Sequence, residues 1–122
     1  MPHGRGLTDA ERQRARAAVA VELARARAQG VSLSRQFDDI VAAAELSNTD
    51  DEHDPEGTTI AFERSQVSAL IKQVTRDVDA LERTLTTVDD EAFGTCERCG
   101  RSIGIERLVA LPATRYCVHC AG

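Results

Sequence analysis

A chain of 122 residues has the length of a single domain, but three phenylalanines, one tyrosine and no tryptophan leave little material for a compact core. Small apolar residues, arginine and acidic residues dominate, and this composition favours long helices over a globule. The formal net charge of −5 excludes attraction to nucleic acid by the field of the whole chain. No apolar run approaches the roughly 20 residues that a transmembrane helix needs.

The first predicted element is a helix over residues 8–47. Thr8 is placed to cap it, with Glu11 as the partner in a capping box. Apolar residues and one glycine then recur at intervals of four and three: Val19, Leu23, Ala26, Gly30, Leu33, Phe37, Ile40 and Ala44. This heptad stripe predicts one helix, with Gly30-Val31 as the candidate position for a kink, because glycine inside a helix costs about 1 kcal/mol relative to alanine.

A second helix is predicted over residues 58–91, ended by Gly94. Asp54-Pro55 suits a helix start, but Gly57 weakens it and favours Thr58 or Thr59 instead. The stripe of this helix, counted through the Arg64 position, is Ile60, Val67, Ile71, Val74, Val78, Leu81, Leu85 and Val88. Two such helices are expected to pack as an antiparallel coiled-coil hairpin, an arm of roughly 45–50 Å. The alternative is an ordinary helical hairpin whose length serves no function.

The link between the two helices, residues 48–57, is the predicted tip of the hairpin. It holds five carboxylates in ten residues. A solvated acidic loop is the plain interpretation. The functional one is that the carboxylates at the end of a protruding arm approach a basic or metal-bearing cavity on a partner. The candidate partner-binding residues are Asp50, Asp51, Asp54 and Glu56.

All four cysteines of the chain lie near its C-terminus, in two C-x-x-C pairs separated by seventeen residues. The pairs are Cys96 with Cys99 and Cys117 with Cys120. Two such turns offer four sulfurs in a tetrahedron, which is the geometry of closed structural zinc sites, and Gly100 suits the left-handed conformation that ends the first turn. The prediction is therefore one structural Zn²⁺.

Three other uses of these cysteines compete with zinc. Disulfides require an oxidising compartment, whereas the first residues contain no apolar signal stretch and favour a reducing cytoplasm. A thioredoxin-like redox pair would need a βαβ context, which is not visible. An iron–sulfur cluster also takes four thiolates and is excluded only weakly. His119 lies between two ligands, and we interpret it as a surface residue.

A closed site of four cysteines leaves no open position for water, and no paired nucleophile and base accompany it, so the sequence does not predict an enzyme. A DNA-binding zinc finger, or a module that binds other proteins, is the alternative function. DNA binding needs a basic recognition surface. The basic residues of this segment are instead scattered over predicted loops: Arg98, Arg101, Arg107 and Arg115.

The segment FGTCERCGRSIGIERLVALPATRYCVHC resembles the zinc-finger signature of the DksA/TraR family of transcription regulators. The resemblance rests on the Phe-Gly before Cys96, the C-x-x-C-G turn, the Arg107-Leu108-x-Ala110-x-Pro112 segment and the closing C-x-x-C. It implies a helix-dominated fold with a coiled-coil hairpin over residues 1–92 and a four-cysteine zinc finger over residues 93–122. It also implies a regulator that binds RNA polymerase rather than DNA, inserting its arm into the secondary channel through which nucleotides reach the active site.

Two features depart from the better-known members of this family. Their tip reads Asp-x-x-Asp-x-Ala, whereas this chain has Asp54, Gly57 and Thr59 at the matching positions. Members that respond to guanosine tetraphosphate use basic residues around the zinc domain, where this chain has Ala80, Leu111 and Ala121. We therefore expect no strong response to guanosine tetraphosphate by that route.

Overall fold

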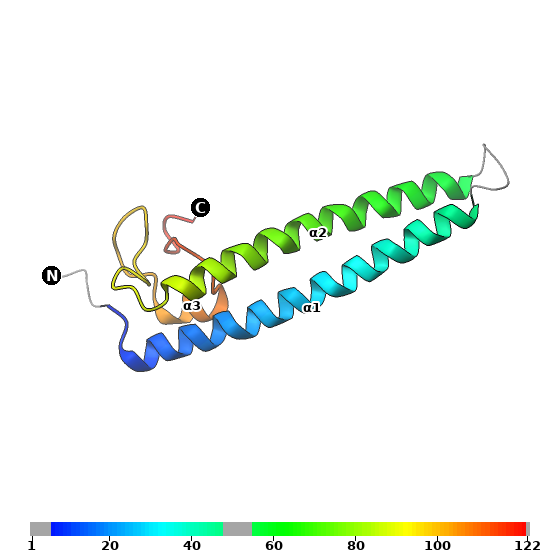
Figure 1. The fold of residues 1–122 in the computed structure, drawn as a ribbon. Coiled ribbons are helices and arrows are strands. Elements are labelled where there is room, and N and C mark those ends of the chain that lie inside the picture. Colours follow the sequence, from blue (N-terminus) through cyan, green and yellow to red (C-terminus); the bar gives the residue numbers. More distant parts are fainter. Residues whose placement is uncertain (1–5, 48–54, 122) are drawn as a thin grey trace. The chain divides into compact units, whose positions relative to one another are not determined.

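The computed structural model describes residues 6–47 and 55–121. Within these two ranges, three helices follow one another: α1 (Asp9–Ser47), α2 (Pro55–Thr87) and the short α3 (Ile105–Ala110) (Figure 1). Among the described residues, the β-structure consists of a single antiparallel bridge between Thr95 and Ser102. None of the described helices is both long and apolar enough to cross a membrane. The predicted fold class, a long helical hairpin followed by a cysteine cluster, is confirmed.

The chain divides into two compact units. The terminal unit contains both ends of the chain, Met1–Arg25 and Val78–Gly122, and the central unit is Ala26–Asp77. Each unit includes a part of α1 and a part of α2.

The start of α1 follows the predicted capping box. The Thr8 N–H donates to Glu11 Oε1 at 3.0 Å, and the Glu11 N–H donates to Thr8 Oγ1 at 3.0 Å. This reciprocal pair satisfies backbone donors that the first turn of a helix leaves without partners. The helix then continues through Gly30 without interruption for 39 residues.

Gly30 of α1 faces Val74 of α2 in the central unit. A Cβ atom built on this residue would lie 3.4 Å from Cγ1 of Val74 on α2. This is an ordinary van der Waals distance, so the packing of the two helices does not require a glycine here, although glycine weakens helix propensity.

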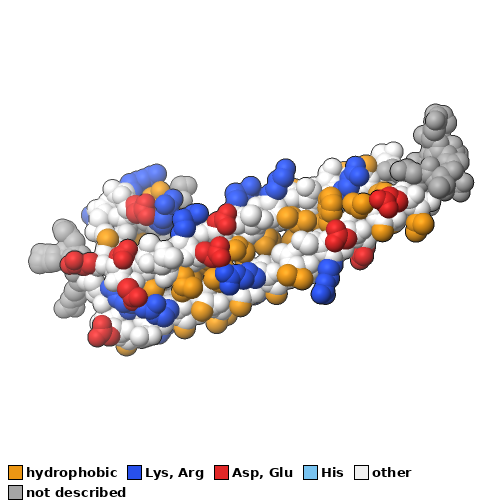
Figure 2. Space-filling model, viewed as in Figure 1, with side chains coloured by type: hydrophobic (Ala, Val, Ile, Leu, Met, Phe, Trp, Pro, Cys, Tyr) orange, Lys and Arg blue, Asp and Glu red, His pale blue; other side chains and the backbone are white. Residues whose placement is uncertain are grey.

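The predicted stripes form the seam of the hairpin, and burial follows a seven-residue repeat. On α2 and just beyond it, Val67, Val74, Leu81 and Val88 are buried. On α1 the buried residues are Ala15, Val19, Leu23, Ala26 and Leu33. Figure 2 shows hydrophobic side chains gathered along the line where α1 and α2 meet, with charged side chains of both signs on the outer surfaces. The heptad prediction is confirmed for these positions, except for Ala15, which the predicted stripe did not include.

Two positions counted in the α2 stripe do not belong to the buried seam. Leu85 is 37% exposed and Arg64 is exposed. They share the heptad position of Ile71 and Val78, which are only half-buried. In a pair of helices, side chains at this heptad position lie at the edge of the contact between the helices, where water still reaches them.

The boundaries of the second helix differ from those predicted. It begins at Pro55 instead of residue 58, because proline is well suited to the first helical position and the cost of Gly57 is tolerated. It ends at Thr87 instead of residue 91. Acidic residues are unfavourable at the negative end of a helix dipole, and the next residues after Val88 are Asp89, Asp90 and Glu91. Gly94 therefore lies in a turn after the helix, with a φ of +89°.

Candidate metal centre

Each cysteine pair lies on its own tight turn. In the first turn, the Gly100 N–H donates to the Cys96 carbonyl at 3.0 Å, and Gly100 has a φ of +76°. This left-handed conformation is the one predicted for Gly100, and it costs glycine little because it has no Cβ. In the second turn, the N–H groups of Cys120 and Ala121 both donate to the Cys117 carbonyl, at 3.1 and 3.0 Å.

Backbone hydrogen bonds bring the two turns together. The Glu97 N–H donates to the Arg115 carbonyl at 2.9 Å and links the first turn to the chain just before the second. The Cys96 N–H donates to the Arg101 carbonyl at 2.8 Å and closes the first turn as a loop. Below the turns, Cys96 and Cys117 belong to a buried cluster with Ile103 and Leu108. The cysteine positions are thus fixed by both polar and apolar contacts.

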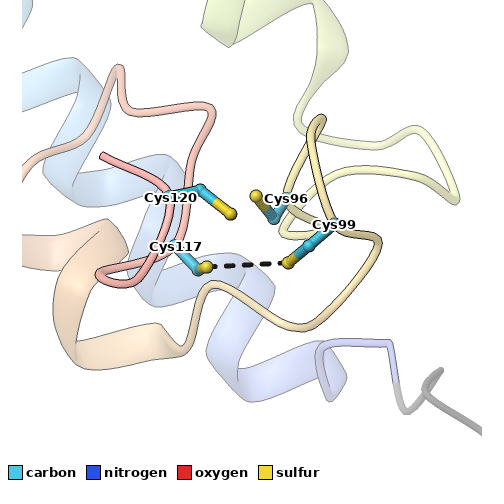
Figure 3. Close-up of side chains that lie close together, drawn as sticks. All are labelled: Cys96, Cys99, Cys117 and Cys120. Atoms are coloured by element: carbon cyan, nitrogen blue, oxygen red, sulfur yellow. Dashed lines mark hydrogen bonds between the residues drawn. The ribbon is translucent and has the colours of Figure 1, made fainter. Parts of the chain in front are cut away.

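The four sulfur atoms converge on one point (Figure 3). All four Sγ atoms lie within 4.8 Å of one another, and those of Cys99 and Cys117 are 3.7 Å apart. A tetrahedral Zn²⁺ with Zn–S bonds of about 2.3 Å requires sulfurs about 3.8 Å apart, so the cluster fits this ion closely. All four cysteines are free thiols, and none forms a disulfide.

The protonation of these thiols also fits a cation among them. Burial opposes ionisation of Cys96, but hydrogen bonds from backbone N–H groups, those of Cys117 and Cys99 foremost, lower the pKa of Cys96 to about 6. At Cys120, burial and then hydrogen bonds with the neighbouring cysteines raise the pKa to about 12. Burial and hydrogen bonding thus lower the pKa of Cys96 and raise that of Cys120. A bound Zn²⁺ deprotonates such ligands outright, because its charge stabilises all the thiolates together.

Two arginine side chains form hydrogen bonds with the backbone of the second cysteine turn and of the residue before it. The Arg98 guanidinium donates to the Cys120 carbonyl at 3.2 Å and lies 5.4 Å from the centre of the Tyr116 ring. Arg107, on α3, donates from Nε to the Tyr116 carbonyl at 3.0 Å. These contacts hold the chain on both sides of Cys117, and such supporting contacts orient metal ligands.

The structure thus brings together the four cysteines that the sequence singled out. Cys96 and Cys117 are buried, Cys120 is half-buried and Cys99 is exposed. His119 is exposed, as predicted for a surface residue. Of the predicted tip residues, Asp50, Asp51 and Asp54 lie outside the described residues. Glu56 falls in the first turn of α2, but its side chain lies outside the described part.

Sequence reasoning missed α3 and the role of Leu7. Arg107 lies on this short helix rather than on a loop, contrary to the prediction for the basic residues. Gly104, with a φ of +92°, precedes α3, and the glycine was the available signal of a turn before it. Leu7 packs against the buried cluster of the cysteines. An apolar residue just before an N-cap often packs on the first turn of its own helix, so the position of Leu7 gave no signal of its contact with the cysteine cluster.

Residues 91–122 match a protein family described as the prokaryotic dksA/traR C4-type zinc finger. A segment of 43 residues, 35% of this chain, is 49% identical to RNA polymerase-binding transcription factor DksA of Salmonella typhimurium and to that of Escherichia coli K12. The corresponding factor of Haemophilus influenzae is 45% identical over 40 residues. In each of these relatives the matched segment spans only 28% of the protein.

The chain as a whole is similar in fold to transcription factor DksA2 from Pseudomonas aeruginosa. The TM-score is 0.75, with 93% of this chain and 81% of that chain covered at 15% sequence identity. The fold similarity therefore extends over the helical hairpin. The C4-type family and the clustered sulfurs together establish one structural Zn²⁺. Residues 91–122 thus match the dksA/traR zinc-finger family, and the chain as a whole is similar in fold to DksA2.

Proposed function

We propose that this chain binds RNA polymerase and regulates the initiation of transcription. The observation that carries the proposal is the 49% identity, over 43 residues around the metal centre, to proteins named RNA polymerase-binding transcription factors. The similarity in fold to transcription factor DksA2 over 93% of the chain supports it, because this similarity includes the helical hairpin.

The mechanism we propose assigns different tasks to the two parts of the fold. The hairpin enters the secondary channel of the polymerase, and the tip acts near the catalytic centre. Four carboxylates of the tip carry the effect: Asp50, Asp51, Asp54 and Glu56. Carboxylates close to catalytic metal ions or mobile catalytic elements shift their equilibria through electrostatic interactions alone. Gly57 and Thr59 carry no charge, so in this mechanism the effect depends on these four acidic residues.

The surface around the metal centre supplies affinity in this scheme. Arg98 and Arg107 are poor candidates for docking, because their guanidinium groups are engaged with carbonyl groups of the same segment. Arg101 is exposed and better suited to meet a partner. Leu111 and Ala121 are exposed apolar residues that offer no charge to a phosphate, so we propose no strong response to guanosine tetraphosphate at these positions.

We do not propose catalysis or recognition of DNA. Four thiolates complete the tetrahedral shell of zinc and leave no open position for a substrate or water. A DNA-binding surface needs basic residues aligned on one element. In the metal segment, Arg98 and Arg107 are held by internal contacts, and Arg115 lies 3.7 Å from Glu97 in an exposed ion pair.

The test separates binding from effect. Neutralising the tip with Asp50→Asn, Asp51→Asn, Asp54→Asn and Glu56→Gln should leave the Kd for core RNA polymerase within a few-fold, while the change in transcription in vitro is lost. A matched control removes the same number of charges from exposed positions on the helices, with Asp38→Asn, Asp39→Asn, Glu45→Gln and Glu63→Gln. This control should retain both binding and effect.

Two results would contradict different parts of the proposal. Loss of binding in the tip variant makes the tip a docking element and refutes the division of tasks. A wild-type chain that does not bind polymerase refutes the function itself. Salt-dependent binding of the wild-type chain to duplex DNA alone would instead support the DNA-binding alternative.

A further inference from the structure

Leu7 joins the start of the chain to the metal centre. It packs against the buried cluster formed by Cys96, Ile103, Leu108 and Cys117, two of which are zinc ligands. Leu7 directly precedes Thr8, whose side chain caps α1. An apolar contact thus connects two of the ligands to the residue that precedes the N-cap of α1, a helix remote from them in sequence.

The contact between Leu7 and the turn at Gly94 is close. A Cβ atom on Gly94 would lie 3.2 Å from Cγ and 3.3 Å from Cδ1 of Leu7. The backbone of Gly94 also has a φ of +89°, and its carbonyl accepts a hydrogen bond from the Ile103 N–H at 2.8 Å. Leu7 therefore fills the space that is free because Gly94 has no side chain.

Two arginines of α1 make polar contacts with the same stretch of chain. Arg12 donates from Nη1 to the Val88 carbonyl and to the Asp90 carbonyl, the latter at 3.1 Å. Arg16 forms an ion pair with Asp89. The Val88 side chain is fully buried. The guanidinium of Arg12 thereby binds two carbonyl groups in the turn that follows α2.

We propose that residues 7–16 act as a strap through which zinc binding stabilises the first half of α1. Zinc binding orders the cysteine turns, because a metal site of this kind is coupled to folding. The ordered turns complete the apolar cluster that holds Leu7 and fix the residues 88–94 to which Arg12 and Arg16 bind. Zinc binding thus stabilises α1 through contacts between segments that are distant in sequence, and we expect this stabilisation to be confined to the terminal unit.

Amide hydrogen exchange of the full chain, measured by NMR with zinc bound and after treatment with a high-affinity chelator, tests this device. Zinc removal should speed exchange at residues 13–25 about tenfold or more, because these amides open with the unit that the metal stabilises. Exchange at residues 30–44 should change much less. Equal exchange at residues 13–25 in the two states would overturn the proposal.

A pair of variants tests whether the strap carries the coupling. In Leu7→Ala/Arg12→Gln, zinc should still bind, but its removal should no longer alter exchange at residues 13–25 by more than about twofold. The matched control is Val21→Ala/Arg14→Gln, which changes the same residue classes at exposed positions of α1 and should keep the full effect of zinc. A full zinc effect in the strap variant would refute the role of these contacts.

Discussion

The two units of this protein bury their apolar residues to different degrees. The largest fully buried side chains, those of Leu108, Val19, Val88 and Cys96, all belong to the terminal unit. In the central unit the buried residues retain 6–8% exposure: Ala26, Leu33, Val67 and Val74. Both units contain the same two helices, so the helices alone do not explain the difference.

The difference shows what a third segment contributes to a helical pair. Two helices cover only one stripe of each other, and the edges of that stripe remain open to water. In the terminal unit, α3 and the cysteine turns add a second cluster, which Leu7 joins from the start of the chain. A chain with few aromatic residues has little else to build a core, and small cores of this kind are often completed by a metal.

Removing one zinc ligand should separate the two regions most strongly. Cys117→Ser deletes a buried ligand, and three thiolates hold zinc much less tightly than four. We expect zinc content, measured by mass spectrometry of the native protein, to fall from about one per chain to near zero. The NMR signals of residues 93–120 should lose the chemical-shift dispersion of a folded segment, while the signals of the central unit keep theirs. Unfolding of both units to the same extent would contradict the comparison.

A charge in the central seam should have the next largest effect, in the opposite region. Val74 is 6% exposed, and Val74→Asp buries a carboxylate without a partner. The cost is several kcal/mol unless the helices separate to hydrate the charge. Circular dichroism should show a large loss of helix and a lower Tm, while zinc content stays unchanged. Val21→Asp, at a position 68% exposed, is the control and should melt close to wild type.

Alanine at two glycines should shift stability in opposite directions. Gly30→Ala should stabilise by up to about 1 kcal/mol through helix propensity, since the new methyl group meets Val74 at 3.4 Å, an ordinary contact. Gly94→Ala should destabilise by about 1–2 kcal/mol from its positive φ alone, with a further cost from the contact with Leu7. Urea denaturation measures both changes.

Gly104→Ala separates the two costs at Gly94. Gly104 also has a positive φ, but no atom lies within 4 Å of a Cβ built there. It should therefore destabilise less than Gly94→Ala. An equal or larger effect would show that the contact between Leu7 and Gly94 contributes nothing.

The features predicted from sequence are those that neighbouring residues encode. The capping box of Thr8 and Glu11 spans a single turn, and the heptad stripes are periodic over many turns. The cysteine spacing carries its own geometry, so the sequence alone predicts the cluster of four cysteines that the structure contains. Such patterns survive without knowledge of tertiary contacts.

The features that were missed depend on contacts between distant residues or on very short elements. Leu7 meets the metal cluster across most of the chain length, and no local pattern encodes that contact. The six residues of α3 are too few to show a helical period. Helix α2 ends early because acidic residues follow Val88 and Arg12 binds the carbonyl groups there. The acidic residues are visible in the sequence, whereas the contact of Arg12 with these carbonyl groups is not.

Site-specific photo-crosslinking to RNA polymerase tests the central functional claim most directly. A photoreactive benzoylphenylalanine replaces Thr58, an exposed residue near the start of α2, or Asp9, an exposed residue at the start of α1. If the hairpin enters the secondary channel, the probe at position 58 crosslinks to polymerase segments that line the channel near the active site. The probe at position 9 crosslinks elsewhere. Crosslinks from position 58 only to the outer surface of the polymerase, or to promoter DNA, would contradict the account.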